Sequence, residues 1–274
     1  MSTFKASVII STYNQPEWLE KVLWGYEVQT ESNFEIVIAD DGSTQKTKDL
    51  IDGFIKSSTL KIKHVWQEDQ GFQKTKILNK AILQVTSDYL IFTDGDCIPR
   101  NDFVETHLKL SKINTFLSGG YFKLPDTISQ TITKKHIATQ ACFNLDWLLK
   151  QGLKKNFKTN KLNSFGFKRW FLNTFTPTKA TFDGMNVSGY KQDILKANGF
   201  DERMQYGGED RELGERLMNA GVKFKQIRYS AVCLHLYHER PYKNEEVLKF
   251  NKEIRNHTKK QKIIHTKFGI HKNE

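Results

Sequence analysis

The stretch Asp88–Asp96, DYLIFTDGD, runs from an apolar segment into two carboxylates, and this pattern indicates a buried strand that ends in acids. Two earlier segments have a similar apolar, β-branched character: ASVIIST at residues 6–12 and FEIVIADDGS at residues 34–43. The second of these also ends in acids, followed by a glycine turn. We therefore predict three buried strands, two of which end in carboxylates.

Helical patterns separate these strands. Strands that alternate with helices predict a mostly parallel sheet covered on both faces, so the expected fold class is α/β. The apolar residues that follow Pro16 recur at helical spacing, and the segment after the second strand is polar and helical. We expect helices at about 15–29, 44–55 and 73–84, and a further alternating strand at 60–66.

The second half of the chain is less regular. We predict one catalytic domain over residues 1–240, with a basic helical insertion at about 127–181, and a basic helical tail at 241–274. No repeat or low-complexity linker divides the chain. The expected elements of this half are a strand in FLSGGYFKL at 116–124, a mainly helical section at 127–173, a helix that follows DGMNVSGYK and ends before Gly199, a helix that begins at GGED, and extended chain at 222–238.

Composition limits the class of protein. The chain has 274 residues, 38% of them hydrophobic, which is enough for one large domain with a proper core. Its net charge of +11 favours a phosphate-bearing substrate, a polyanion or an anionic membrane, but no nucleic-acid-binding signature is present, so we expect no nucleic-acid partner. Three widely spaced cysteines, no apolar window of spanning length and no signal-peptide pattern favour a cytoplasmic protein.

The segment Lys150–Lys179 concentrates positive charge, because it mixes Lys and Arg with Phe and Trp and contains no acid. It has two interpretations: a solvated helical face with core aromatics, or a surface that docks on anionic lipid, which would place the protein peripherally on the cytoplasmic face of the inner membrane. The tail at 251–274 is also basic and could mediate self-association, although the sequence does not reveal the oligomeric state.

Three acidic clusters follow predicted strands or begin a predicted helix: Asp40-Asp41, Asp94-Gly95-Asp96 and Glu209-Asp210. In open α/β sheets, ligands bind outside the carboxyl ends of the strands. Two carboxylates separated by one glycine suit Mg²⁺ or Mn²⁺ together with phosphate oxygens. An EF-hand does not fit, since Ile98 and Pro99 occupy a ligand position and the sharp-turn position, and the P-loop and G-x-G-x-x-G patterns are absent.

Gly207 and Gly208 precede the third cluster. They could form a plain turn before an acidic helix start, or they could let a substrate approach the backbone beside a carboxylate that accepts a proton. His235 and His238 are three residues apart, so on a strand they would lie on opposite faces and one of them would point at a metal.

Five ordered blocks then show a family resemblance: VIISTYNQPEWLEKVL, IVIADDGSTQKT, WQEDQGFQKTKILNKAI, YLIFTDGDCIPRNDFV and FDERMQYGGEDRELGERL. Together they resemble family 2 glycosyltransferases of the GT-A fold. GGED with the downstream CLHLYH looks like the galactosyltransferase-type C-terminal portion of bacterial polysaccharide enzymes and chondroitin polymerases. The resemblance covers residues 4–122 and 182–240, and the section from about 127 to 181 matches nothing in it.

The resemblance implies roles for residues at the matching positions. The catalytic base is Asp210, with Glu209 helping to position the acceptor. Acceptor contacts fall on Tyr206, Gly207 and Gly208. Metal binding falls on Asp96 with His235 or His238. The nucleotide-sugar pocket takes Thr12, Tyr13, Asn14, Asp40, Asp41, Gly71, Lys76, Asn79, Asp94 and Gly95.

Two positions depart from the family pattern. Tyr206 stands where relatives often have Trp, so we expect different stacking on the acceptor, and Lys76 stands where many have Arg, which replaces a fork by a point charge.

The implied activity is inverting transfer of a hexose from a UDP-sugar to a hydroxyl of a glycan or lipid-linked glycan, with Mn²⁺ or Mg²⁺, in bacterial surface polysaccharide synthesis. The alternatives are a nucleotidyltransferase, although STYNQPEW lacks the glycine-rich basic loop that such an enzyme needs, and a non-catalytic nucleotide- or glycan-binding module of the same fold.

Overall fold

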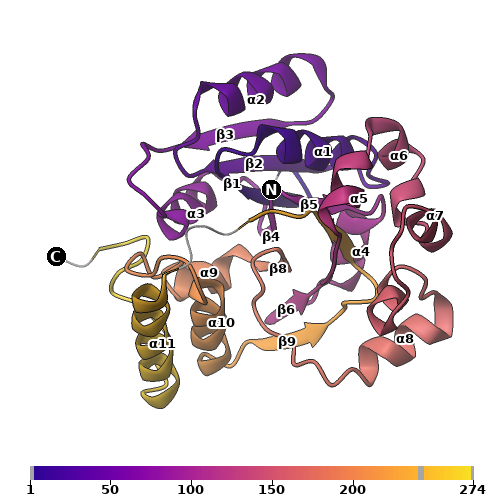
Figure 1. Ribbon diagram of the computed structural model, residues 1–274. Coiled ribbons are helices and arrows are strands. Elements are labelled where there is room, and N and C mark those ends of the chain that lie inside the picture. Colours follow the sequence, from indigo (N-terminus) through magenta and orange to yellow (C-terminus); the bar gives the residue numbers. More distant parts are fainter. Residues whose placement is uncertain (1–2, 240–243, 273–274) are drawn as a thin grey trace.

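A seven-stranded sheet forms the centre of the molecule, in the order β3-β2-β1-β4-β8-β6-β9 (Figure 1). The computed structural model describes residues 3–239 and 244–272. The pairs β1–β2, β2–β3, β1–β4 and β6–β9 are parallel, whereas β8 is antiparallel to both of its neighbours. The predicted mostly parallel α/β sheet is confirmed. Its strands are β1 (Ala6–Thr12), β2 (Phe34–Asp40), β3 (Ile62–Trp66), β4 (Tyr89–Asp94), β6 (Thr115–Ser118), β8 (Asn186–Tyr190) and β9 (Lys223–Gln226).

Helices cover both faces of this sheet, as the alternating pattern predicts. Helices α1 (Pro16–Glu27) and α2 (Gln45–Ser57) bury Leu19 and Ile51 against the inward side chains of β1 and β2. Helix α3 (Lys74–Gln84) buries Ile77 on the other face, against the alternate residues of the same strands. Because side chains alternate along a strand, a fully buried strand needs both layers, and the apolar runs in the sequence reflect this.

The helix expected after DGMNVSGYK and before Gly199 is present, but strand β8 within that segment was not predicted. The segment pairs between β4 and β6 before the short helix α9 (Lys191–Lys196) begins. Gly189 permits this position, since a Cβ there would lie 2.5 Å from the ring of Phe116 on β6. The close approach of two strands, which no local pattern reveals, therefore decides the structure of this segment.

A second, smaller sheet, in the order β5-β10-β7, follows the carboxyl ends of β4 and β6. The single strand expected in FLSGGYFKL is in fact two strands, because the chain crosses from β6 to the small sheet at Gly119 and Gly120. A Cβ at either glycine would lie about 2 Å from Asn186 or from the carbonyl of Arg228, so only glycine fits this crossing. The small sheet consists of β5 (Cys97–Pro99), β7 (Gly120–Lys123) and β10 (Val232–His235), and α4 (Phe103–Leu110) follows β5.

The predicted basic insertion is helical, as expected, but it consists of short pieces. Apolar side chains of its first part, among them Ile128, Ile137 and Leu148, are buried in the same core as α1. Its last helix is different, because all of α8 is described and none of its side chains is buried. The pieces are α5 (Asp126–Thr131), α6 (Lys134–Ala138), η1 (Ala141–Phe143), α7 (Leu145–Lys150), η2 (Phe157–Lys161) and α8 (Gly166–Thr174).

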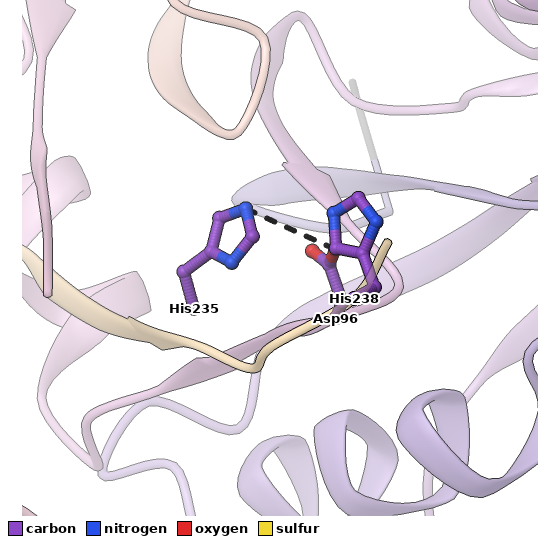
Figure 2. Close-up of side chains that lie close together, drawn as sticks. All are labelled: Asp96, His235 and His238. Carbon is purple, nitrogen blue, oxygen red and sulfur yellow. Dashed lines mark ion pairs between the residues drawn. The ribbon is translucent and has the colours of Figure 1, made fainter. Parts of the chain in front are cut away.

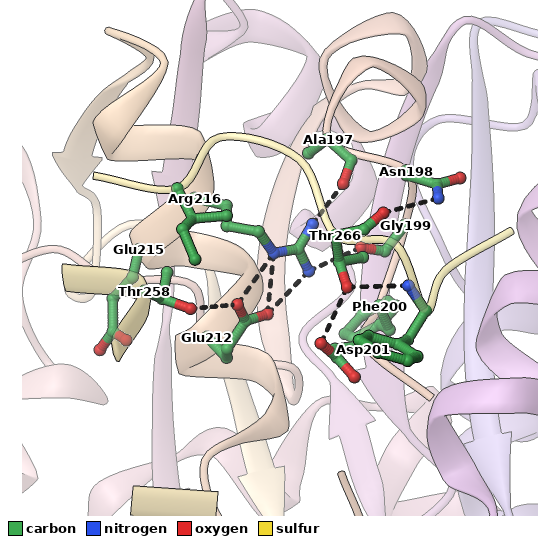
Figure 3. A network of polar contacts seen from close by, with 12 residues as sticks. Ala197, Asn198, Gly199, Phe200, Asp201, Glu212, Glu215, Arg216, Thr258 and Thr266 are labelled. Atoms are coloured by element: carbon green, nitrogen blue, oxygen red, sulfur yellow. Dashed lines mark hydrogen bonds and ion pairs between the residues drawn. The ribbon is translucent and has the colours of Figure 1, made fainter. Parts of the chain in front are cut away.

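The C-terminal helix α11 (Glu245–Lys260) packs against α10 (Glu209–Asn219), beside the sheet (Figure 1). A buried network fixes α10 in place (Figure 3). The guanidinium of Arg216 is fully buried, pairs with Glu212 at 2.7 Å, and donates to the carbonyls of Ala197 and Gly199. Thr258 of α11 donates to the same carboxylate at 2.8 Å. The helical tail is therefore part of the folded unit. Within the described residues, no helix is long and apolar enough to cross a membrane.

Candidate active site

A cavity of about 620 Å³ lies at the carboxyl ends of β1 and β4, a volume suited to a small-molecule ligand. The segment Asp94–Asp96 and the acids Glu209 and Asp210 both line it, although more than a hundred residues separate them in sequence. The fold thus brings two of the predicted acidic clusters to one site. Other expected residues that line the same cavity are Thr12, Tyr13, Asn14, Asp41, Gly71, Tyr206, Gly207, Gly208, His235 and His238.

Three side chains converge at one end of this cavity: Asp96, His235 and His238 (Figure 2). One ligand atom from each lies within 4.8 Å of the other two. Nε2 of His238 is 3.0 Å and Nε2 of His235 is 3.9 Å from Oδ2 of Asp96. The expectation that the two histidines lie on opposite faces is wrong, because β10 ends at His235 and His238 lies on the following loop, where strand alternation no longer applies.

Backbone carbonyl groups orient the two imidazole rings. Nδ1 of His235 lies 2.7 Å from the carbonyl of Leu236, and Nδ1 of His238 lies 2.8 Å from that of Glu239. A proton on each Nδ1 satisfies these carbonyls, so each Nε2 faces Asp96 either as a proton donor to the carboxylate or, without its proton, as a ligand for a cation between them. This is the arrangement in which histidines bind metals, with the second nitrogen held by a backbone acceptor.

The carboxylate of Asp96 suits a cation as well. Burial alone would raise its pKa, but the hydrogen bond from His238 and the proximity of His235 hold the pKa of Asp96 below its usual range. One carboxylate and two imidazoles are a donor set that a divalent ion such as Mn²⁺ accepts, and the set leaves room for further oxygen ligands. The described residues therefore fit the metal that the sequence predicts.

The backbone holds this cluster together. His235 is paired with Cys97 across the antiparallel strands β10 and β5, and the amide of Leu236 donates to the carbonyl of Asp96 at 2.8 Å. The loop that carries His238 is held by Trp18, whose indole donates to the carbonyl of Tyr237, and by Ser129 of the insertion. The geometry of this cluster is thus fixed by hydrogen bonds to its main chain on both sides.

Asp94 serves a different group. Its Oδ1 accepts hydrogen bonds from Ser11 at 2.6 Å and from the ammonium of Lys74 at 2.7 Å. Burial opposes the charge on Lys74, but the carboxylates of Asp94, Glu209 and Asp210 raise its pKa above the usual value. A permanently charged Lys74 lies close to both acidic clusters and offers a fixed positive charge to a phosphate group.

Glu209 and Asp210 occupy the first turn of α10, where the positive end of the helix dipole favours carboxylates. Oδ2 of Asp210 accepts from the amide of Gly184 at 3.0 Å, and Glu209 accepts from the amide of Gly207 at 2.9 Å. Burial and the neighbouring Asp210 raise the pKa of Glu209 above its usual range, against the effect of Lys74. The two acids therefore differ in environment, as an acid pair with divided tasks would require.

The structure gives a reason for glycine at positions 207 and 208 that the sequence did not reveal. Their φ angles are 112° and 91°, in the left-handed region, and a Cβ on Gly207 would lie 2.2 Å from Leu248 of α11. Asn251 of α11 donates to the carbonyls of Gln205, Tyr206 and Gly207. The glycines line the cavity, but their missing side chains make room for α11.

The opposite end of the cavity contains amide and carboxylate groups. Asp41 accepts from Gln67 at 2.6 Å and from the amide of Gln73 at 2.8 Å, and burial raises its pKa. The hydroxyl of Tyr13 donates to Asp69 at 2.8 Å. These groups form an ordered polar surface of the kind that recognises a base and a ribose.

Three expected pocket residues do not line the cavity. Asp40 is fully buried, accepts from the amide of Ser43 and pairs with His64 of β3 at 2.9 Å. Asn79 exchanges two hydrogen bonds with the backbone of Phe200, which fastens α3 to the segment after α9. Lys76 lies on α3 outside the lining residues. Asp40 and Asn79 thus have structural partners within the fold.

The cavity residues that were not predicted from the sequence include Lys74 and Asp183. Lys74 is two positions from Lys76 on α3, and the structure places Lys74 on the side of the helix that faces Asp94. Burial and the nearby Asp210 raise the pKa of Asp183 to about 6, although Arg211 lies 3.7 Å away. The only sequence signal for Asp183 was the Asp-Gly pair that precedes β8.

Comparison with known proteins agrees with this architecture. Residues 7–174 match the model of "Glycosyl transferase family 2", and residues 174–239 match that of "N-terminal domain of galactosyltransferase". The first match covers more than half of the chain, so the chain belongs to glycosyl transferase family 2. The matched region includes most of the insertion, so the expectation that this section matches nothing in the family is wrong.

Relatives and solved structures extend this result. The chain is 26% identical over 254 residues to a chondroitin synthase of Escherichia coli (86% of this chain, 34% of the relative) and 28% identical over 234 residues to a validoxylamine A glucosyltransferase of Streptomyces hygroscopicus (82% and 54%). It thus spans about a third to a half of these relatives. Solved structures with the same fold include a Pyrobaculum calidifontis mannosyltransferase in complex with GDP-Man and Mn²⁺ (TM-score 0.58, 17% identity, 87% and 58% covered) and Staphylococcus aureus TarS 1–349 in complex with UDP-GlcNAc (0.56, 15%, 86% and 60%).

Proposed function

We propose that this chain is an inverting, metal-dependent glycosyltransferase that moves a hexose from a UDP-sugar to a hydroxyl of a glycan or lipid-linked glycan. One observation carries the proposal: a candidate metal-binding cluster and a helix-start carboxylate pair line the same cavity. A single sugar held in that cavity would meet both. The family membership favours this activity over the nucleotidyltransferase and non-catalytic alternatives.

The donor side of the reaction falls to the first half of the chain. Asp41 and Tyr13 would hold the base and ribose, and Lys74 would hold the diphosphate by charge. Asp96, His235 and His238 would hold Mn²⁺ or Mg²⁺, which when bound neutralises charge on a diphosphate leaving group. The relatives whose names include UDP-GlcNAc, GDP-Man or Mn²⁺ support a nucleotide-sugar donor and a divalent metal.

The acceptor side falls to the start of α10. Asp210 would take the proton of the attacking hydroxyl, since the amide of Gly184 fixes its Oδ2 while both carboxylate oxygens remain acceptors. Attack from the face opposite the departing nucleotide would invert the anomeric centre. Glu209, with its raised pKa, would donate a hydrogen bond to the acceptor while protonated and so help to position it.

Substitution of the proposed base tests this assignment. We expect Asp210→Asn to lower turnover by 10²- to 10⁴-fold, the usual contribution of a general base, while UDP binding in the presence of Mn²⁺ stays the same. The measurement is UDP release from UDP-sugars plus acceptor, with Asp146→Asn, an exposed acid on α7, as the control. Turnover of Asp210→Asn at the wild-type rate would refute the role of Asp210.

The cellular role follows from the acceptor. The E. coli relative is a chondroitin synthase, which supports a place in the synthesis of a bacterial surface polysaccharide. We further propose that the protein works at the cytoplasmic face of the inner membrane, where lipid-linked acceptors are presented.

A further inference from the structure

The end of the insertion presents an aromatic patch to solvent. Five of its side chains are between 46% and 76% exposed, and the rings of four of them form one cluster, with centroids of Phe171 and Phe175 4.7 Å apart and those of Phe167 and Trp170 5.4 Å apart. The total exposed ring surface is on the order of 600 Å², the upper limit for apolar patches on ordinary monomers. The aromatic patch consists of Phe165, Phe167, Trp170, Phe171 and Phe175.

Helix α8 is turned with its aromatic side outward. Phe167, Trp170 and Phe171 follow the i, i+3, i+4 pattern of one face and are exposed. The opposite face, with Arg169, Leu172 and Asn173, is only half-exposed. Asn173 donates to Ser230 at 2.9 Å and accepts from the amide of Tyr229, so polar bonds hold this second face on the body. The hydrophobic effect in water alone would favour the reverse orientation.

The charge around the patch indicates what covers it. Residues 147–182 carry Lys and Arg and no acid, and Lys154, Lys155 and Lys158 are all exposed in the part of this segment that precedes the patch. Large aromatics and clustered lysines in one exposed segment suit an interface that is apolar inside and anionic outside. A bilayer of anionic lipids has this structure, with acyl chains for the rings and phosphates for the ammonium groups.

The patch has a rigid path to the cavity. Lys161, the last residue of η2, donates to the carbonyl of Tyr121 on β7 at 2.7 Å, and β7 is paired with β10, which carries His235. A surface held at α8 would therefore also set the distance of the metal cluster from that surface.

We propose that the aromatic patch and its neighbouring lysines dock the protein on an anionic membrane, with α8 lying in the plane of the lipid headgroups. This deepens the proposed function, since it specifies the surface by which an enzyme acting on lipid-linked acceptors approaches them. It does not depend on the assignment of the metal or the base.

Co-sedimentation with vesicles of phosphatidylglycerol and phosphatidylethanolamine, compared with phosphatidylcholine alone, tests the proposal. We expect wild-type protein to bind the anionic vesicles and not the neutral ones. The triple variant Phe167→Ser, Trp170→Ser, Phe171→Ser should lose most binding without loss of fold, since it removes only exposed side chains. No binding of the wild type at low salt would overturn the proposal.

Two matched triple variants distinguish binding through this patch from binding through the net charge of the protein. Lys154→Gln, Lys155→Gln, Lys158→Gln should weaken binding by about 100-fold. The control removes the same charge from exposed positions of α11, Lys249, Lys252 and Lys260, on the far side of the molecule from α8 in Figure 1, and should leave binding nearly unchanged. Equal losses in both triples would show that general electrostatics, and not this surface, drives binding.

Two further readouts distinguish other causes. If sedimentation analysis shows a dimer that the aromatic triple converts to monomer, and vesicles do not bind, a second copy covers the patch and the membrane proposal fails. Stabilisation of the patch variants by UDP with Mn²⁺ should equal that of the wild type. If UDP with Mn²⁺ does not stabilise the wild type either, the result counts against the proposed function and not against the membrane proposal.

Discussion

Two clusters of buried charge in this molecule have opposite designs. Around Arg216 and Glu212, the donors and acceptors are matched by one another, by two carbonyls and by Thr258 (Figure 3). Around Asp96, the side chains converge, but His235 is 3.9 Å away, beyond hydrogen-bond reach (Figure 2). Buried charges whose hydrogen bonds are all made within the protein hold segments together, so we call Arg216 and Glu212 the joint. Buried charges with incompletely matched partners can bind a ligand, so we call Asp96, His235 and His238 the binding cluster. Variants of the two clusters should have different effects.

The largest effect is expected in the binding cluster. Asp96→Asn removes the charge that holds a divalent ion and should lower Mn²⁺-dependent turnover by about 10³-fold or more, because such an ion contributes several kcal/mol to the transition state. Folding should be unimpaired. UDP-release assays and Mn²⁺-dependent UDP binding measure the loss. Asp88→Asn, an exposed acid at the other end of β4, is the matched control, and unchanged UDP affinity in Asp96→Asn would contradict the metal site.

The joint should respond in stability. Arg216→Met leaves the Glu212 carboxylate buried without its partner and should cost about 3 to 5 kcal/mol of unfolding free energy, measured by denaturant titration. Arg255→Met, which breaks a partly exposed pair with Glu215, should cost about 1 kcal/mol. The double variant Arg216→Met, Glu212→Leu should recover much of the loss, since no charge then remains buried. A double variant as unstable as the single one would show that packing dominates.

Helix α11 connects the joint to the cavity, and Asn251 provides the contact. Asn251→Ala leaves the carbonyls at Gln205–Gly207 without their donor and should cost about 1 to 3 kcal/mol. Because this loop positions Asp210, turnover should fall by more than UDP binding does. Asn256→Ala, an exposed asparagine on the same helix, should change neither quantity. Equal losses in turnover and UDP binding would mean that Asn251 supports the whole cavity and not this loop alone.

The smallest effect is expected at Asp183, a carboxyl group of the cavity whose charge is disfavoured by burial. The pKa of Asp183 is raised to about 6, above the unfolded value of about 3.9, so the folded state loses stability as pH rises through this window. Asp183→Asn avoids this loss. It should be more stable than the wild type by about 1 kcal/mol at pH 7, after allowance for partial exposure, and the difference should vanish below pH 4. Melting temperatures across pH 4–7 measure it; a difference that grows at low pH would reverse the sign.

The first half of the fold could be predicted from sequence because its signals are local. Apolar runs that end at Asp40 and Asp94 and helices with regular periodicity each carry their own pattern. Strand β8 and the division of FLSGGYFKL depend on contacts between distant segments, at Gly189 with Phe116 and at Gly120 with Arg228. No window of sequence contains those contacts, so the prediction failed there.

The candidate site divides in the same way. Asp96 and Asp210 were found because their motifs are short. The convergence of His235 and His238 on Asp96 depends on where β10 ends. The position of Lys74 in the cavity, where Lys76 was expected, depends on which side of α3 faces Asp94. Residue types could be read from the chain, but orientation had to come from the three-dimensional structure.

The antiparallel pairing of β5 with β10 has a consequence for variation among such proteins. Asp96 and His235 are adjacent through this pairing, so the chain leaves the metal cluster after β5 and returns to it at β10. Within that stretch β6, β8 and the carboxylates at the start of α10 must keep their places, but the exposed helix α8 can change its length or surface while both ends stay fixed. The architecture thus separates a chemical centre from an exposed, replaceable segment, and new acceptors or cellular locations could be acquired without rebuilding the centre.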